Sequence, residues 1–277
     1  MRTEEKVLEH IWQALLLGLA LSTLIGCLAY KLQALDGGGV AGAVLVGTAL
    51  FGFGGMPGGA ILLLFFLSSS MLSSFQAARK ASLVAKFVKG HRRDLAQALA
   101  NGGVAAIAAA LYALTEISWA WAAIVGAVAA ANADTWATEL GVLSSIPPRL
   151  ITTGGTVPVG SSGGITPTGL FAALAGAASI AGLAIWLHPD SAPALLLAVG
   201  TIGGFAGAML DSLLGASLQA IYWCEACSQE TEYHPHHRCG QPTRQLRGWV
   251  GLQNDWVNFF ATLVGAVVAA GTFSMLA

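Results

Sequence analysis

The chain has 277 residues, of which 55% are hydrophobic and only 10% are charged, and its formal net charge is -1. Ordinary soluble domains carry roughly 25% charged residues, so this composition excludes a soluble globular protein. It predicts an all-α, polytopic membrane helix bundle that has the lipid bilayer, and no nucleic acid, as a partner.

Apolar stretches long enough to cross the bilayer need about 20 residues as helix. In chain order they are 10–33, 57–75, 95–115, 117–143, 166–187, 192–222 and 255–276. An eighth stretch, 39–54, is short and rich in glycine, so we expect about seven or eight transmembrane helices. They form a single integral membrane domain over 1–277, which contains a small cytoplasmic Cys/His insert at 223–250.

The basic residues predict the orientation of these helices. With eight spans, most of the 13 Lys and Arg lie on one side, in loops 76–94, 144–165 and 223–254. The positive-inside rule makes that side cytoplasmic and places both termini outside. A re-entrant 39–54 segment would leave these loops together and move the N-terminus inside. We expect a multi-pass protein of the bacterial inner membrane whose active site faces the cytoplasm.

Acidic residues interrupt the apolar stretches. Asp134 and Glu139 lie in 117–143, Asp211 lies in 192–222, and Asp255 opens 255–276. Carboxylates within a membrane are costly and indicate a functional site. At 1.5 Å per residue, Asp134 and Asp211 both lie about 15–18 Å from the cytoplasmic ends of their helices. The four acids are the candidate catalytic residues and Mg²⁺ ligands, unless each is only a packing device satisfied by a nearby Thr or Trp.

Other polar residues converge on the same cytoplasmic side. Arg92 and Arg93 are placed to bind the phosphates of a ligand, although basic residues at this position also fix topology and contact anionic lipid. Asn254 is a candidate N-cap of the last helix. The candidate substrate-binding residues on the helices and their ends are Arg92, Arg93, Gln97, Asn101, Asn132, Asn254 and Asn258.

A glycine-rich loop over 151–169 follows the most acidic helix. Its glycines allow backbone N–H groups to converge on an anion, and Pro167 stands where the next helix begins, at a helix N-terminus that favours phosphate. No Gly-Lys-Ser/Thr follows, so this is not a Walker A loop. The candidate phosphate ligands are Thr156, Gly160, Ser161, Ser162, Gly163 and Gly164. A flexible connector is the alternative.

The insert contains a pattern typical of structural zinc sites. Cys224 and Cys227 form a Cys-x2-Cys pair, and Cys239 follows with histidines beside it. A Cys3His site binds zinc tetrahedrally. His236 and Cys239 are separated by two residues, as Cys224 and Cys227 are, so His236 is one candidate for the fourth ligand. His237 is the other candidate. A disulfide is disfavoured in the cytoplasm.

Several of these motifs together carry a resemblance. They are Asn132-Ala-Asp-Thr-Trp-Ala-Thr-Glu139, Leu210-Asp-Ser-Leu-Leu-Gly215, Gln97-Ala-Leu-Ala-Asn-Gly102, Asn254-Asp-Trp-Val-Asn258 and the glycine loop. The chain resembles the uncharacterised integral membrane family that includes transmembrane protein 19 and the plant phytyl-phosphate kinase. This resemblance implies phosphoryl transfer from a nucleoside triphosphate, with CTP as a candidate, to an isoprenyl monophosphate.

Phosphoryl transfer suits the residues found, because it requires Mg²⁺, cations and positioning rather than covalent chemistry by the protein. A membrane nucleotidyltransferase that releases pyrophosphate would use the same metals. An ion or lipid transporter is a third interpretation. A transporter should have a polar path that reaches both faces of the membrane, whereas the outer halves of these helices are almost purely apolar, which favours an enzyme cavity open on one side.

Overall fold

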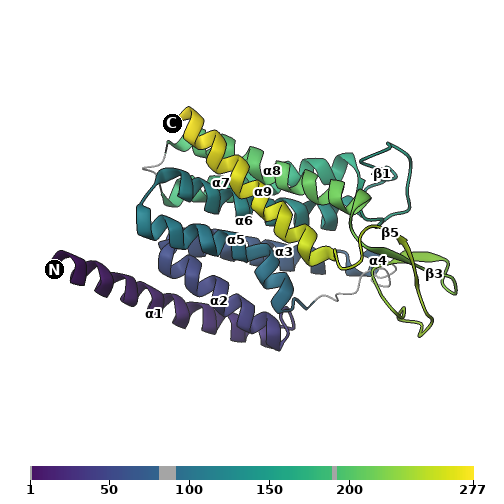
Figure 1. The fold of residues 1–277 in the computed structure, drawn as a ribbon, viewed down its shortest axis with the longest axis horizontal. Helices are drawn as coiled ribbons and strands as arrows, with labels where there is room; N and C mark the ends of the chain where they lie inside the picture. Colours follow the sequence, from purple (N-terminus) through teal and green to yellow (C-terminus); the bar gives the residue numbers. More distant parts are fainter. Residues whose placement is uncertain (1, 81–91, 189–191) are drawn as a thin grey trace.

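The computed structural model describes residues 2–80, 92–188 and 192–277. Within these ranges eight long helices run back and forth along one direction (Figure 1). They are α1 Arg2–Lys31, α2 Gly37–Phe53, α3 Gly55–Ser74, α5 Leu95–Thr115, α6 Ser118–Gly141, α7 Pro167–Leu187, α8 Pro193–Ser217 and α9 Asn254–Leu276. A short helix, α4, spans Ala77–Lys80. Lys86 and Lys89 of the predicted basic loop lie outside the described residues.

Both chain ends lie at one end of the bundle, and the strands lie at the other (Figure 1). We call the latter the loop end; it carries the 32–36 connection, the glycine-rich loop and the Cys/His insert. Alternation of the eight helices therefore places the predicted basic loops at a common end, as the sequence suggests.

Six of the described helices are long and apolar enough to cross a membrane, namely α1, α3, α5, α7, α8 and α9. The expected total of seven or eight included α2, which has only 17 residues, and α6. Helix α6 is enclosed by its neighbours, and every residue from 120 to 133 is buried. Because α6 faces protein rather than lipid, it does not need to be strongly hydrophobic, and it can therefore carry polar residues.

Small residues bring α6, α8 and α9 into backbone contact in two successive layers. In the first layer, a Cβ atom on Gly203 would lie 2.6 Å from the carbonyl oxygen of Gly265. In the second, one turn nearer the loop end, a Cβ on Gly207 would lie 2.6 Å from the carbonyl oxygen of Ala261 and 2.5 Å from Cβ of Ala130. Glycine and alanine thus allow the close approach that is typical of membrane helices.

Two small sheets form at the loop end. Strands β1 (Arg149–Leu150) and β2 (Gly164–Ile165) pair antiparallel and close the glycine-rich loop. In the insert, β3 (Ile221–Cys224) lies between β4 (Gln229–Thr231) and β5 (Arg244–Arg247), both antiparallel to it.

The sequence prediction of a helix over 192–222 is wrong at its C-terminal end, because α8 ends at Ser217. The apolar residues Ile221 and Tyr222 instead belong to β3, where both are buried. Hydrophobicity alone did not distinguish a membrane helix from the buried strand that follows it.

Candidate active site

Asp134 on α6 and Asp211 on α8 lie side by side, with their carboxyl groups close enough to share a hydrogen bond. Asp211 Oδ2 is fully buried and has no hydrogen-bond partner among the described residues. Two carboxylates at this separation repel each other unless a proton or a cation lies between them. The pair therefore forms an oxygen-rich site that suits a hard divalent cation.

The packing layers place one residue of α9 at the level of this pair. Asp134 and Asp211 follow Ala130 and Gly207 by four residues, and Asn258 precedes Ala261 by three. Since Ala130, Gly207 and Ala261 meet in one layer, the three polar residues lie one helical turn closer to the loop end.

Asp255 and Asn254 begin α9, one turn nearer the loop end than Asn258. Asp255 Oδ1 is buried. The N-cap of α9 is Gln253 rather than the predicted Asn254, which is the first helical residue. Asn254 is therefore not used as a cap, and its half-buried side chain stands beside Asp255 in the first turn.

Glu139 on α6 contacts α3. Ser73 Oγ on α3 donates a hydrogen bond of 2.6 Å to Glu139 Oε1. The negative charge of Glu139 also acts on Arg93, which lies just before α5. Glu139 thus links α6 electrostatically to the start of α5.

Asn132 joins three helices. Its Oδ1 accepts a hydrogen bond from Ser68 on α3 at 3.0 Å, and its Nδ2 donates to the Gly176 carbonyl at 2.8 Å and to Ser179 on α7 at 3.2 Å. The side chain is completely buried. This arrangement gives the predicted substrate-binding residue a structural role.

We expect Asn132→Ala to lower the free energy of unfolding by about 1–2 kcal/mol, since hydrogen bonds between membrane helices average roughly 0.6 kcal/mol each. Thermal unfolding in detergent would measure the change. Thr135→Ala is the matched control, because among the described residues the Thr135 hydroxyl bonds only to the Ala131 carbonyl of the same helix. Equal losses in both variants would contradict the interhelical role.

The sequence interpretation overlooked the serines of α3. Ser68 bonds to Asn132 and accepts from Trp136 Nε1, Ser73 bonds to Glu139, and Ser70 lies 3.5 Å from Arg93 Nη1. Three serines at 68–70 and two at 73–74, near the end of an apolar span, were the signal that could have identified them. Helix α3 therefore connects the acidic helix to Arg93.

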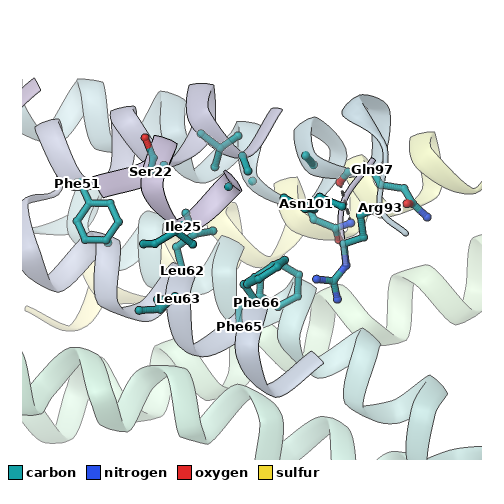
Figure 2. Close-up of a pocket in the computed structure, with 18 residues that line it drawn as sticks. Ser22, Ile25, Phe51, Leu62, Leu63, Phe65, Phe66, Arg93, Gln97 and Asn101 are labelled. Carbon is teal, nitrogen blue, oxygen red and sulfur yellow. Dashed lines mark hydrogen bonds between the residues drawn. The ribbon is translucent and has the colours of Figure 1, made fainter. Parts of the chain in front are cut away.

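An apolar pocket lies between α1, α2, α3 and the start of α5. Ile25, Phe51, Leu62 and Leu63 line its apolar part, and Figure 2 shows Arg93, Gln97 and Asn101 together at the opposite end. None of the four candidate acids is among its described lining residues. The predicted single cavity is thus divided between this pocket and the aspartate pair.

Local structure fixes Arg93 at the mouth of the pocket. Its backbone N–H donates to Ala34 O, and its carbonyl accepts from Asp36 N, so the segment pairs with the α1–α2 connection. The guanidinium lies 5.6 Å from the ring centre of Phe65 and 5.4 Å from that of Phe66. Cation–π contacts of this kind orient a cation without consuming its hydrogen-bond donors.

Arg92 and Arg93 differ sharply in position. Arg92 Nε donates to Leu35 O at 3.2 Å, and its guanidinium lies 5.3 Å from the ring centre of Tyr30. Arg92 is exposed and fixes the α1–α2 connection. Only Arg93 of the predicted pair lines the pocket.

Gln97 and Asn101 lie one turn apart on α5. Asp94 and Gln97 form a capping box, in which Gln97 N donates to Asp94 Oδ1 and Asp94 N donates to Gln97 Oε1. Asn101 Nδ2 donates to Gln97 O at 3.0 Å. The capping box explains why α5 begins where the sequence predicts, directly beside Arg93.

The glycine-rich loop folds back on itself and packs on α8. Ile151 N donates to Gly163 O, and Ser162 Oγ donates to Gln219 Oε1 at 2.5 Å. Gly163 has a φ of +81° and its Cα touches Ala216 so closely that no Cβ fits there. The predicted residues Gly160, Ser161 and Gly164 are half-buried, whereas Thr156 is exposed.

The N-terminus of α7 follows the loop, as predicted. Pro167 is the first helical residue, and the N-cap Thr166 accepts a hydrogen bond from Gly169 N at its side chain. The Gly169 N–H group, which could have bound an anion at this helix N-terminus, thus already donates to the Thr166 side chain.

The insert brings four potential metal ligands together. The ligand atoms of Cys224, Cys227, His237 and Cys239 all lie within 4.8 Å of one another. A hydrogen bond from the backbone of Gln241, with a further one from His237, lowers the pKa of the Cys239 thiol to about 6. The hydrogen bond with Cys239, followed by burial, instead raises the pKa of the Cys227 thiol to about 11. The thiolate, which is the form that binds metal, is therefore favoured at Cys239 and not at Cys227. His236 is exposed and lies outside this group, so His237 is the histidine that the fold selects.

Comparison with known proteins adds the family. A family model described as integral membrane protein DUF92 matches residues 20–266, a range that contains every candidate residue named above. Protein PGR of Arabidopsis thaliana is 33% identical over 276 residues, covering 90% of this chain and 93% of that protein. An uncharacterized membrane protein of Methanocaldococcus jannaschii is 33% identical over 238 residues, covering 86% of this chain and 85% of that protein. No solved structure matches the chain.

Proposed function

The chain belongs to the integral membrane protein family DUF92, and on that premise we propose that it is a Mg²⁺-dependent kinase of isoprenyl (phytyl-like) monophosphates. The donor is a nucleoside triphosphate, with CTP as a candidate, and the product is the prenyl diphosphate. One observation carries the proposal. An apolar pocket ends in Arg93, and the serines of α3 join Arg93 to α6, the helix that bears Asp134 and Glu139.

The pocket suits a hydrocarbon tail with an anionic head. Its lining is predominantly apolar with a few polar groups gathered at one end, as is usual for ligand pockets. Apolar side chains from three membrane helices would surround the tail. Arg93 would bind the phosphate bidentately, and the amides of Gln97 and Asn101 offer further polar contacts.

The aspartate pair suits Mg²⁺, which prefers oxygen ligands and is held in proteins by one or two carboxylates plus substrate phosphates. Asp134 and Asp211 are the first candidates. Glu139 on α6 and Asp255 at the start of α9 are the further candidates that the sequence suggests. When held by Asp134 and Asp211, Mg²⁺ would supply positive charge that neutralises the negative charge developing on the phosphates during transfer.

In the proposed reaction, an oxygen of the prenyl monophosphate attacks the γ-phosphorus of the nucleotide. A new P–O bond forms as the bond to the β-phosphate oxygen breaks, and the nucleoside diphosphate leaves with that electron pair. Phosphate monoesters have a second pKa of about 6, so the nucleophile is already ionised near neutral pH and needs no general base.

The loop end would face the cytoplasm, where nucleotides are available. Basic residues predict this orientation, and the glycine-rich loop stands at that end beside α8. We propose that the exposed part of the loop contacts the nucleotide phosphates.

The test uses purified protein with Mg²⁺, labelled CTP or ATP, and prenyl monophosphates of several lengths. The proposal requires a nucleoside diphosphate and a prenyl diphosphate as products, formed only with Mg²⁺ or Mn²⁺. Release of pyrophosphate would instead identify a nucleotidyltransferase. No nucleotide consumption, together with ion or lipid movement in reconstituted vesicles, would identify a transporter.

The shape of the pocket also predicts chain-length preference. Figure 2 shows Phe51 at the end of the pocket remote from Arg93. We expect Phe51→Ala to shift the ratio of kcat/KM values toward longer prenyl chains by about tenfold or more, because apolar pockets discriminate by 1–3 kcal/mol per methylene. Phe171→Ala is the matched control, since Phe171 is 74% exposed on α7 and lines no part of this pocket. An unchanged preference in Phe51→Ala would place the tail elsewhere.

A further inference from the structure

We propose that the insert binds one zinc ion through Cys224, Cys227, His237 and Cys239, and that this metal holds the glycine-rich loop in place on α8. The zinc site is independent of the proposed reaction. The positioning role rests on the proposed function. It assigns the zinc ion to hold in place the glycine-rich loop, which is proposed to contact the nucleotide phosphates.

The spacing of the ligand atoms suits a tetrahedral ion. Cys224 Sγ lies 3.6 Å from Cys239 Sγ, and His237 Nδ1 lies 3.4 Å from Cys227 Sγ and 3.3 Å from Cys239 Sγ. Zinc bonds of about 2.3 Å to sulfur and 2.0–2.1 Å to nitrogen place tetrahedral ligands roughly 3.5–3.8 Å apart. These three distances therefore lie within a few tenths of an ångström of those of a tetrahedral zinc site, and all four ligand atoms lie within 4.8 Å of one another.

The surroundings of His237 support its role as the fourth ligand. The imidazole is buried, with Nδ1 toward the cysteines and Nε2 at 3.5 Å from the side-chain amide of Gln229. Metal-binding histidines usually have their second nitrogen held by a polar group, which fixes the tautomer and the ring orientation. By contrast, the exposed His236 lies in an isolated bridge with Pro242.

The ligands connect the separate parts of the insert. Cys224 ends β3, Cys227 lies in the β3–β4 turn, and both His237 and Cys239 lie between β4 and β5. An ion at this point would hold the β3–β4 hairpin and the segment that leads into β5 together. The sheet is too small to have a substantial hydrophobic core, and such domains commonly depend on metal for folding.

The same insert holds the glycine-rich loop. Buried Gln219 accepts a hydrogen bond from Ser162 of the loop and donates one to Glu232 of the insert at 2.9 Å. Arg247 on β5 donates to the carbonyls of Gly215 and Ala216 on α8 at 2.8 Å and to Ser162 O at 3.2 Å.

Arg247 is itself tied to the insert, because it also forms an ion pair of 3.7 Å with Glu230 on β4. The loop is therefore bound on α8 by two side-chain bridges that are anchored in the insert. Glu230 and Arg247 lie on β4 and β5, and Glu232 directly follows β4. Loss of the metal is expected to release the loop from α8.

The first experiment measures metal in the full chain, purified in detergent without chelator. We expect about one zinc per chain, almost complete loss in Cys224→Ser and His237→Ala, and full retention in His236→Ala. Cobalt(II) replacing zinc should show the thiolate-to-metal absorbance of a site with three cysteines. Absence of metal from the wild-type protein, or full retention by His237→Ala, would overturn the site.

The second experiment measures hydrogen exchange over residues 149–165 in zinc-loaded and chelated protein. We expect exchange in this loop to become about tenfold faster or more on chelation, with α1 and α2 unchanged as internal controls. Gln219→Leu should retain zinc and loosen the loop without chelation. Unaltered loop exchange in both cases would refute the positioning role, and neither readout depends on which reaction the protein catalyses.

Discussion

Asp134→Asn and Asp211→Asn are each expected to lower kcat/KM roughly 1,000-fold or more while leaving the protein folded in detergent. Metal ions supply several kcal/mol of charge stabilisation in a transition state, and each 1.4 kcal/mol corresponds to a factor of ten. The two carboxyl groups lie within reach of each other across the α6–α8 contact, so removing either charge should disrupt the same ion. Initial rates at several Mg²⁺ concentrations would measure the loss.

Glu116→Gln is the matched control for these two variants. It also removes one carboxylate, but Glu116 is the exposed C-cap of α5 at the opposite end from the loops. Near-normal activity in Asp134→Asn and Asp211→Asn would remove the pair from the catalytic centre. A loss in Glu116→Gln as large as theirs would show that charge removal acts through folding.

Arg93→Gln is expected to reduce kcat/KM for the prenyl phosphate by roughly 10- to 150-fold, because a hydrogen bond to a charged group is worth about 1.5–3 kcal/mol. The reduction should appear mainly in KM for the lipid and leave KM for the nucleotide little changed. Steady-state kinetics with each substrate varied in turn would separate the two constants.

Arg92→Gln provides the comparison, since it alters the preceding residue of the same type. Arg92 contacts Leu35 O and the Tyr30 ring, so we expect its substitution to change KM for the lipid less than about threefold, as for ordinary surface positions. Similar increases in both variants would indicate general electrostatic attraction of the lipid rather than a bound phosphate at Arg93.

The helices could be predicted largely from the sequence, because length and apolarity define them. The prediction of 95–115 coincides with α5, whose start is fixed by the Asp94–Gln97 capping box. The place of α6 in the bundle could not be predicted. Its burial depends on glycine and alanine faces of several helices meeting, and sequence periodicity does not say which helices pair.

The candidate site was predictable in composition but not in arrangement. A common depth for Asp134 and Asp211 followed from counting residues, and the structure places them in contact. The different roles of Arg92 and Arg93 depend on the pairing of Arg93 with the distant 34–36 segment. The identity of the fourth potential ligand, His237 rather than His236, likewise depends on the path of the chain between β4 and β5. The spacing of the cysteines and histidines in the sequence does not specify that path.

The glycine and alanine layers beneath the aspartate pair have a consequence for ion selectivity. Backbones that touch at Gly203, Gly207 and Ala261 cannot move closer together, and they allow little sliding before atoms collide. The backbone positions that carry the two carboxylates are thus held at a nearly fixed separation. Mg²⁺ requires ligands at 2.0–2.1 Å in near-ideal octahedra, whereas Ca²⁺ prefers 2.3–2.6 Å and more ligands. A rigid helix contact would therefore discriminate by ionic radius, and Ca²⁺ is expected to bind the proposed site more weakly than Mg²⁺ and not to support turnover.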